Sequence, residues 1–393
     1  MEGQLPLKGI HIIGVIGGTE LLGAERGMIQ VLFALKEAGA IVTAGVSGRA
    51  ERGGAVGQHC RDVGFETFTI PFGSHFAKSW MLRDHQYRRA QIRRLFSTSA
   101  LFRNEVIERK PDALLFGSTL TYAFLAVALR RLRIPLVFRV GDVPIVHSRF
   151  QLWLWKSLAR RSHAIVCISD FIQKEAAPHL PRKKQVDVIR NIAPLRTTVL
   201  DTGTLETLIE RKKPSQGVYI GNITAQKGVP ELVDALISLD DSNTGCWILG
   251  GSPHTRDLET RLKARVSSSQ TRTQIEFTGY VSDPRAYLKA ADWHIAPSAH
   301  SEALGNVVQE AKAQGTPSLV TPVGGLPETL TEGQTGWILE GIGAEAIEKG
   351  LHALQVSNSK WKEQAILDEA AIINDTETFR KRWVSVLQST LNP

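Results

Sequence analysis

One stretch of the sequence decides the fold: 293-WHIAPSAHSEALGNVVQEAKAQGTPSLV-320. The apolar runs Trp293-Ala296 and Ser318-Val320 are short enough to be buried strands, and the residues between them fit a loop followed by a helix. Strand, loop, helix and strand in this order indicate a parallel sheet covered by helices. One carboxylate, Glu302, falls in the loop after the first strand, and a second, Glu310, falls within the helix.

The same alternation of apolar runs and helical patterns extends through the whole chain. Strand-like runs occupy residues 9–16, 41–46, 113–116, 135–140 and 164–168, and after residue 191 they occupy residues 217–220, 246–249, 274–277, 293–296 and 318–320. Continuous apolar runs of this kind are typical of parallel strands that are buried on both faces. We therefore expect two doubly wound, Rossmann-like α/β domains.

A polar stretch between residues 192 and 215 predicts the domain boundary. We expect an N-terminal domain over residues 1–195 and a C-terminal domain over residues 196–374. Residues 375–393 have apolar side chains at helical spacing and no following strand, so they predict a final helix that can cap either domain and that we assign to the N-terminal one.

Composition is that of a soluble folded protein, with 42% hydrophobic and 22% charged residues among 393. A net charge of +8 favours anionic partners without choosing among them. Cys60, Cys167 and Cys246 have no metal-ligand spacing and are expected to be buried free thiols, as in a reducing cytoplasm. The N-terminus lacks a secretory signal pattern. The uncharged run 113–129 is interrupted at residues 117–119, so it reads as a strand and a helix and not as a membrane span.

A glycine-rich loop, residues 17–26, follows the first predicted strand and precedes a helix. Gly18 and Gly23 allow backbone turns that other residues resist, and the loop either binds a phosphate or is a tight connection. The glycine spacing is out of register with the dinucleotide fingerprint, and the next strand is not followed by an acidic residue. A nicotinamide-dependent dehydrogenase is therefore disfavoured.

The stretch 296–317 resembles the donor site of the retaining glycosyltransferases of family 4, in which two glutamates separated by seven residues straddle a nucleotide sugar. Glu302 and Glu310 have this spacing. The resemblance also covers Gly315-Pro317, Val323-Glu328, Gly333-Gly336, Gly221-Gly228, Gly279-Val281, Ser169, Asn191 and, more loosely, Gly23-Arg26. It implies the GT-B fold, in which two Rossmann-like domains face each other across a cleft. The acceptor would bind in the N-terminal domain and the nucleotide sugar in the C-terminal one.

The resemblance also implies roles for individual residues. Glu310 would accept hydrogen bonds from the ribose hydroxyls, Glu302 would hold hydroxyls of the transferred sugar, and Lys227 would stabilise the diphosphate leaving group. The diphosphate would lie on amides at the start of the helix. The remaining donor-binding candidates are Gly221, Asn222, Tyr280, Leu304, Gly305, Asn306 and Val307.

Two positions depart from the family pattern. The family usually has an arginine where this chain has Asn222, so one cation near the diphosphate is missing. Many relatives have a histidine where this chain has Gly141. We expect Asp142 to orient the acceptor hydroxyl or the sugar, and we count His147 with the acceptor-side residues, although nothing shows that it replaces the missing histidine.

The expected reaction moves a sugar from a nucleoside diphosphate, UDP or GDP, to the hydroxyl of a glycan, a lipid-linked intermediate or a small molecule, with retention of configuration. No cluster of metal ligands and no pyridoxal phosphate signature stands out, so neither a metal nor another cofactor is expected. Three alternatives stay open: a nucleotide-sugar epimerase on the same scaffold, a non-catalytic nucleotide-sugar-binding protein, and a phosphorylase-type enzyme.

A basic segment, Arg83 to Lys110, is interleaved with apolar residues. It predicts either a helix that lies on an anionic membrane surface, which would make the protein a peripheral protein of the inner face, or a solvated helix beside the active site. Nothing else in the sequence resembles a nucleic-acid recognition module, so nucleic acid is not an expected partner.

Overall fold

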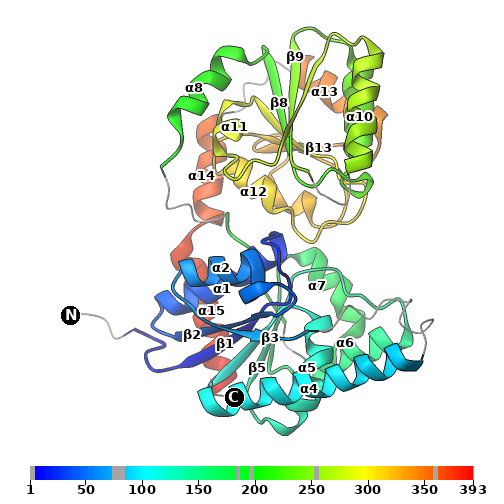
Figure 1. Cartoon of the computed structure of the whole chain (residues 1–393). Coiled ribbons are helices and arrows are strands. Elements are labelled where there is room, and N and C mark those ends of the chain that lie inside the picture. Colours follow the sequence, from blue (N-terminus) through cyan, green and yellow to red (C-terminus); the bar gives the residue numbers. More distant parts are fainter. Residues whose placement is uncertain are drawn as a thin grey trace. The chain divides into compact units, whose positions relative to one another are not determined.

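The computed structural model describes residues 5–72, 85–182, 184, 186–193, 199–251, 256–356 and 362–392. It divides the chain into two compact units (Figure 1). Unit 1 comprises Met1–Asn191 and Thr376–Pro393, and unit 2 comprises Ile192–Asp375. The chain therefore leaves unit 1 close to the expected boundary and returns to it with its last helix.

Unit 1 is built on a seven-stranded parallel sheet with the order β3-β2-β1-β4-β5-β6-β7. Its strands are β1 (His11–Val15), β2 (Ile41–Ser47), β3 (Glu66–Ile70), β4 (Ala113–Phe116), β5 (Leu136–Val140), β6 (Ala164–Cys167) and β7 (Val186–Val188). The first strand lies between β2 and β4, so the chain winds outward from β1 first to one side and then to the other.

The helices of unit 1 cover this sheet. They are α1 (Gly23–Glu37), η1 (Glu51–Gly53), α2 (Gly54–Asp62), α4 (His85–Arg109), α5 (Thr119–Arg131), α6 (Arg149–Arg161), α7 (Asp170–Ala176), η2 (Ala177–His179) and α15 (Thr376–Leu391). Serine side chains cap α5, α6 and α7 by accepting hydrogen bonds from first-turn amides, which satisfies donors that have no partner within a helix.

The last helix, α15, packs against α1 and β5 of unit 1. Its buried residues Trp383, Val386 and Leu387 recur at helical spacing and lie against Leu35 of α1 and apolar side chains of β1, β4 and β5. The hydrophobic face of α15 thus completes a core whose other members lie in the first 140 residues of the chain.

Unit 2 is built on a six-stranded parallel sheet with the order β10-β9-β8-β11-β12-β13. Its strands are β8 (Ser215–Ile220), β9 (Thr244–Leu249), β10 (Gln274–Gly279), β11 (Trp293–Ala296), β12 (Ser318–Val320) and β13 (Gly336–Ile338). Its helices are α8 (Thr202–Arg211), η3 (Ala225–Lys227), α9 (Val229–Leu239), α10 (Arg256–Ser269), α11 (Arg285–Ala290), α12 (Asn306–Lys312), η5 (Leu326–Thr329), α13 (Ala344–Val356) and α14 (Glu363–Ile373).

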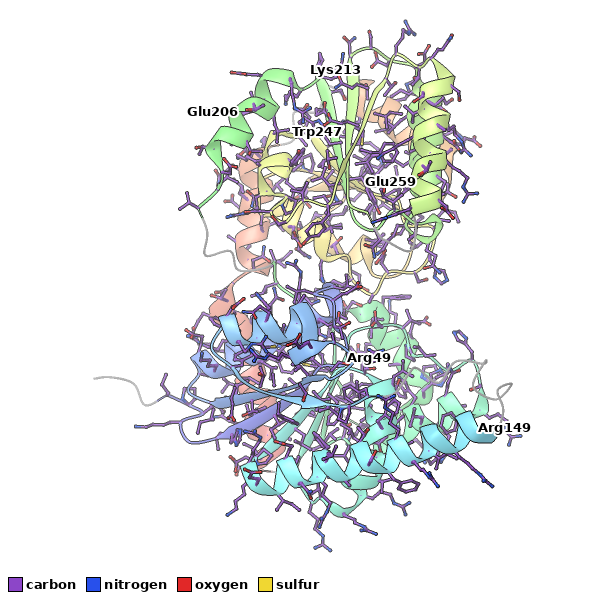
Figure 2. All side chains as sticks on the ribbon, viewed as in Figure 1. Arg49, Arg149, Glu206, Lys213, Trp247 and Glu259 are labelled. Atoms are coloured by element: carbon purple, nitrogen blue, oxygen red, sulfur yellow. The ribbon has the colours of Figure 1, made fainter. Side chains whose placement is uncertain are left out.

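Apolar side chains on both faces of this sheet are buried. Trp293 and Ile295 of β11 pack in one cluster with α9 and α13, whereas Val218 of β8 and Trp247 of β9 pack in another with α8 and α11 (Figure 2 labels Trp247). Burial on both faces explains why the strands of unit 2 read as continuous apolar runs.

The structure confirms the expected doubly wound α/β class in both units. The run 113–129 is a strand followed by a helix, as expected, and the three cysteines are free and buried. Within the ranges described above, no helix is long and apolar enough to cross a membrane.

Candidate functional site

The first candidate site lies where the winding of the unit 2 sheet changes direction. The connection after β8 leads to β9 on one side, and the connection after β11 leads to β12 on the other. In doubly wound sheets, the space beyond the carboxyl ends of two such strands is the usual place for a ligand, because no connection covers it. The loops that follow β8 and β11 carry Lys227 and Glu302.

Lys227 and Glu302 form an ion pair at this point. The Nζ atom of Lys227 lies 2.5 Å from Oε1 of Glu302, and the hydroxyl of Ser298 donates to the same oxygen at 2.6 Å. The lysine side chain is 40% exposed and that of the glutamate 20%, so both members of the ion pair are partly accessible to solvent. The structure therefore brings together two predicted residues that lie far apart in the sequence.

The two loops hold each other through backbone contacts. The amide of Ala299 donates to the carbonyl oxygen of Gln226 at 3.0 Å. Gly228, with φ of 70°, lies so close to the second loop that a Cβ atom there would be 1.8 Å from the carbonyl oxygen of Pro297. Only a glycine fits this close approach. It fixes the direction from which Lys227 reaches Glu302.

A third loop, which follows β12, supports the backbone of Glu302. The amide of Gly325 donates to the carbonyl oxygen of Glu302 at 2.8 Å. Gly324 has φ of 60°, and a Cβ atom there would lie 2.2 Å from that same oxygen. The glycine pair in the stretch 323–328 therefore allows this loop to pass directly behind the carboxylate-bearing residue.

Glu310 lies on the helix that the sequence predicts. The helix α12 begins at Asn306, immediately after Gly305, whose φ of 95° turns the chain into the helix. Leu304, which precedes the helix, and Val308, which lies within it, are buried, whereas Glu310, Asn306 and Val307 are half-buried. The predicted start near Gly305 is confirmed.

The remaining predicted donor residues lie along the same edge of the sheet. Gly221 follows β8, and the carbonyl oxygen of the exposed residue Asn222 accepts a hydrogen bond from the hydroxyl of Tyr219 at 2.8 Å. Tyr280 is 75% exposed and follows β10. Two strand spacings separate β10 from β8, or about 10 Å. Tyr280 and Asn222 therefore follow strands that are not neighbours in the sheet.

Sequence reasoning missed two neighbours of the ion pair. Ser298 lies within the stretch 296–317 but has no distinctive pattern around it. The ring of Tyr219 is fully buried in β8, and burial together with the nearby charge of Glu302 raises the pKa of its hydroxyl above the ordinary range. A tyrosine inside an apolar strand gives a weak signal, because its ring satisfies the apolar pattern.

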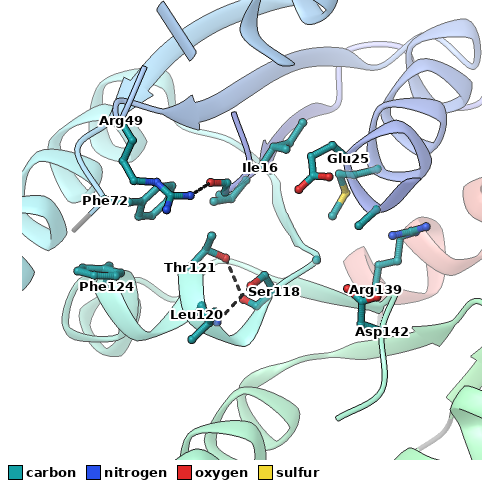
Figure 3. Close-up of a pocket in the computed structure, with 16 residues that line it drawn as sticks. Ile16, Glu25, Arg49, Phe72, Ser118, Leu120, Thr121, Phe124, Arg139 and Asp142 are labelled. Atoms are coloured by element: carbon teal, nitrogen blue, oxygen red, sulfur yellow. Dashed lines mark hydrogen bonds between the residues drawn. The ribbon is translucent and has the colours of Figure 1, made fainter. Parts of the chain in front are cut away.

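The second candidate site is a pocket in unit 1, at the carboxyl ends of β1 and β4, where the winding of that sheet also changes direction. Its volume is about 230 Å³. Figure 3 shows Glu25, Arg139 and Asp142 on one side of the pocket, and Arg49, Phe72 and Phe124 on the other.

The charged side of the pocket is organised around Arg139, which is 2% exposed. Its Nη2 atom donates to Oδ1 of Asn191 at 2.7 Å. Burial lowers the pKa of Arg139 to about 10, while the charges of Asp142 and Glu25 act to raise it. Burial raises the pKa of Glu25, and the charge of Asp142 adds to this effect. A buried cation thus lies between two carboxyl groups of unequal environment.

The opposite side of the pocket combines aromatic rings with a second guanidinium. Phe72 and Phe124 contact each other edge to face, with ring centroids 5.9 Å apart. The Nη2 atom of Arg49 donates to the carbonyl oxygen of Gly17 at 2.7 Å, and its Nε atom donates to the hydroxyl of Ser47 at 3.2 Å. These contacts hold the Arg49 side chain against the pocket wall.

Two of the four predicted acceptor-side residues line this pocket. Asp142 and Gly18 are among the described residues of the lining, and a Cβ atom on Gly18 would lie 2.2 Å from Oε1 of Glu25. Gly23 is instead the first residue of α1, and His147 is exposed before α6. The sequence did carry one signal for Arg139, because it is the single charged residue in the otherwise apolar strand β5.

Among the described residues, no group of three or more His, Cys, Asp or Glu side chains could hold a metal ion. The expectation of a metal-free reaction therefore stays a prediction.

Two family models match the chain. The model described as "Glycosyl transferase 4-like domain" matches residues 23–191, and the model described as "Glycosyl transferases group 1" matches residues 206–372. The first corresponds to most of unit 1 and the second to most of unit 2.

Curated relatives and solved structures agree with these matches. The lipopolysaccharide core biosynthesis glycosyltransferase LpsE of Rhizobium meliloti is 28% identical over 57% of this chain and 60% of its own length. A GDP-mannose-dependent phosphatidylinositol dimannoside mannosyltransferase of Mycobacterium tuberculosis is 32% identical over 29% of each chain. The chain thus matches only part of the length of these relatives.

The structure of Anabaena HepE with UDP-glucose superimposes with a TM-score of 0.78 at 17% identity, covering 97% of this chain and 100% of HepE. At this identity the likeness shows the fold, which is that of the GT-B glycosyltransferases. From the two family matches, one in each unit, and from this fold, the chain belongs to the group 1 glycosyltransferases of family 4.

Proposed function

We propose that this protein transfers a sugar from a nucleoside diphosphate sugar held by unit 2 to an acceptor hydroxyl held by unit 1. The observation that carries the proposal is the Lys227–Glu302 ion pair beyond the carboxyl ends of β8 and β11. A lysine and a carboxylate at the edge where ligands bind in this fold provide one group for a diphosphate and one for sugar hydroxyls.

The ion pair is suited to exchange partners when the donor binds. Both side chains are partly exposed, so separating them costs little. The Lys227 ammonium would move to the diphosphate and stabilise the negative charge that grows on it as the bond to the sugar breaks. Ser298 would keep its hydrogen bond to Oε1 of Glu302, so the carboxylate stays oriented for the hydroxyls of the sugar.

Transfer would proceed with retention of configuration on one face of the sugar. The bond between the anomeric carbon and the phosphate oxygen breaks, the acceptor oxygen forms the new bond, and the departing phosphate takes the proton from the acceptor hydroxyl. Asp142 would accept a hydrogen bond from the acceptor in the unit 1 pocket. This scheme needs no metal, because Lys227 provides the charge that a bound cation provides in other enzymes.

Glu310 and the start of α12 would hold the rest of the donor. A half-buried carboxylate offers two acceptor oxygens for the two ribose hydroxyls, and first-turn amides favour an anionic group. UDP-glucose and GDP-mannose are the first donors to test, since one is bound in the HepE structure and the other is in the mannosyltransferase name. The compartment we propose is the cytoplasm, where three free thiols stay reduced.

The test is a thermal-shift screen of UDP, GDP and their sugars on the wild type and on Lys227→Ala and Glu310→Ala. A ligand of the folded site raises its apparent stability. We expect stabilisation by one nucleotide family, reduced in both variants and unchanged in Lys212→Ala, which breaks a comparable ion pair elsewhere in unit 2. No shift of the folded wild type with any nucleotide would contradict the proposal, and donor conversion without an acceptor would indicate an epimerase.

A further inference from the structure

One surface of unit 1 combines exposed basic and exposed apolar side chains on two helices. On α4 these are Arg89, Ile92, Arg93, Phe96, Arg103 and Ile107, and on α6 they are Arg149, Phe150, Trp153 and Arg160, with the half-buried Lys156 beside them. We call this set the basic apolar face. None of its members serves the donor site or the pocket described above.

The α4 members form one continuous stripe. At 3.6 residues per turn they fall within an arc of about 100° on the helix surface. Ile92, Phe96 and Ile107 are 48%, 55% and 47% exposed, which is unusual for large apolar residues on a helix that already buries another face. That buried face includes Ser99, whose hydroxyl accepts from the amide of Ala128 in α5 at 2.7 Å.

The α6 members repeat the same chemistry. Phe150 and Trp153 stack with ring centroids 6.0 Å apart, and Trp153 is 58% exposed. Arg149 is the first residue of α6, and Figure 2 labels it at the periphery of unit 1. An exposed tryptophan beside arginines is typical of a surface that lies at the headgroup level of a bilayer, because its ring is apolar and its N–H is polar.

The two stripes lie on one side of the unit 1 sheet. The helix α5 packs against both α4 and α6, and Figure 1 shows the three helices grouped together. Successive right-handed crossovers from β3 to β4, β5 and β6 place the three helices on the same face of the sheet. The residues of the basic apolar face therefore all belong to the layer of helices on one face of the unit 1 sheet.

Charge on this layer is mostly positive, and α4 has acidic residues only near its end, at Glu105 and Glu108. Between residues 113 and 169 the sequence holds eight arginines and lysines, and Asp142 is its one acidic residue. Residues 85–104 of α4 contain no acidic residue. Anionic lipid headgroups attract such a surface, and exposed apolar side chains can enter the boundary of the acyl chains.

We propose that the basic apolar face docks unit 1 on an anionic lipid surface. The start of α6 lies at the same edge of the sheet as the unit 1 pocket, because residues 141–148, which link β5 to α6, include the pocket residue Asp142. A docked protein would hold this edge near the membrane. If the proposed function is correct, an acceptor with a lipid tail would reach the pocket without leaving the bilayer.

The experiment is co-sedimentation of the full chain with phosphatidylcholine vesicles, with and without phosphatidylglycerol, at low and high salt. We expect binding only to the anionic vesicles, weakened by salt. The variant Arg93→Glu/Arg103→Glu should bind roughly 30-fold more weakly or worse, since each basic residue near an anionic surface contributes about a factor of five. The variant Phe150→Ser/Trp153→Ser should lose vesicle binding at high salt before it loses binding at low salt.

The matched control for charge is Arg272→Glu/Lys349→Glu, which makes the same change on exposed residues of unit 2. The control for the apolar change is Ile372→Ser, at a residue 77% exposed. Both should bind like the wild type, and thermal unfolding should show that every variant is folded. The readout requires no turnover, so it fails or succeeds independently of the proposed reaction.

Equal binding to neutral and anionic vesicles, or no binding to either, would overturn the proposal. Equal losses in the unit 2 controls would also overturn it, because net charge and not this face would then be responsible. Binding of a single-stranded oligonucleotide that the α4 variant abolishes, without vesicle binding, would assign the face to nucleic acid instead.

Discussion

The guanidinium of Arg139 occupies the space that a side chain at position 141 would need. A Cβ atom on Gly141 would lie 2.8 Å from Nη1 of Arg139. Similarly, a Cβ atom on Gly27 of α1 would lie 2.4 Å from Nη2. Many members of the family have a histidine at position 141. In this chain, the buried side chain of Arg139 fills the space next to that position, which is a glycine.

Gly141→Ala should therefore destabilise the protein. Arg139 is buried and hydrogen-bonded to Asn191, so its guanidinium has little room to move. We expect a loss of about 1–3 kcal/mol in the free energy of unfolding, measured by urea denaturation. Gly203→Ala is the control, because the nearest atom to its Cβ is at 3.5 Å and alanine favours the helix there. Equal stability of the two variants would show that the Arg139 side chain can move away from the new Cβ atom without a loss of stability.

Lys227→Ala should reduce turnover far more than it reduces stability. Loss of a group that stabilises transition-state charge lowers kcat by about 10²–10³, whereas loss of a partly exposed ion pair costs less than about 1 kcal/mol of stability. Steady-state kinetics and thermal unfolding measure the two effects. The control Lys212→Ala breaks the 2.6 Å pair with Asp292 and should leave turnover unchanged. If both variants lose turnover equally, Lys227 has no special role.

Gly228→Ala should cost more stability than Gly333→Ala, although the two glycines have nearly the same φ, 70° and 74°. Both substitutions strain the backbone by about 1–2 kcal/mol. Only at position 228 would the new Cβ also meet an atom, at 1.8 Å from the carbonyl oxygen of Pro297, whereas no atom lies within 4 Å at position 333.

The Gly228→Ala variant should also lose stabilisation by the nucleotide, because it separates the loop of Lys227 from that of Glu302. Urea unfolding with and without the nucleotide measures both effects. Equal losses of stability in the two variants would mean that backbone strain alone acts at position 228.

Stability should respond to pH through Glu25. Its pKa is raised in the folded protein above the ordinary value of 4.5, so the folded state binds more protons than the unfolded state as the pH rises from that value. Stability conferred by this group is therefore present at low pH and is lost as the pH rises through the folded pKa. The stability of Glu25→Gln should therefore exceed that of the wild type most at pH values above the folded pKa of Glu25.

Thermal unfolding of the two proteins across the acidic to neutral range measures the difference. An advantage of Glu25→Gln that shrinks with rising pH would contradict the assignment.

The fold could be predicted from the sequence wherever a strand lies inside a sheet. The three strands that sequence reasoning missed, β3, β7 and β13, all lie at sheet edges. β3 reads Glu-Thr-Phe-Thr-Ile, and β7 reads Val-Asp-Val. Edge strands face solvent and tolerate polar residues, so they lack the continuous apolar run that marks a central parallel strand.

The candidate donor site could be predicted because one stretch of the sequence carries the family pattern. The pocket of unit 1 was harder to predict. Glu25 lies in the first turn of α1, whereas Arg49 and Asp142 follow β2 and β5, and only the strand order brings the three together. Arg49 follows β2 without any local pattern to distinguish it from other surface arginines. Proximity between residues far apart in sequence is a tertiary property, and propensity and periodicity do not contain it.

The return of α15 to unit 1 bears on how the protein is made. A ribosome delivers β1 to β7 first and α15 only after all of unit 2 has emerged. Until then the apolar surface of α1, β1 and β5 that receives Trp383 and Leu387 stays uncovered. Unit 2 is contiguous and can fold while the chain is still being synthesised, so the half that is translated first is the half that is finished last.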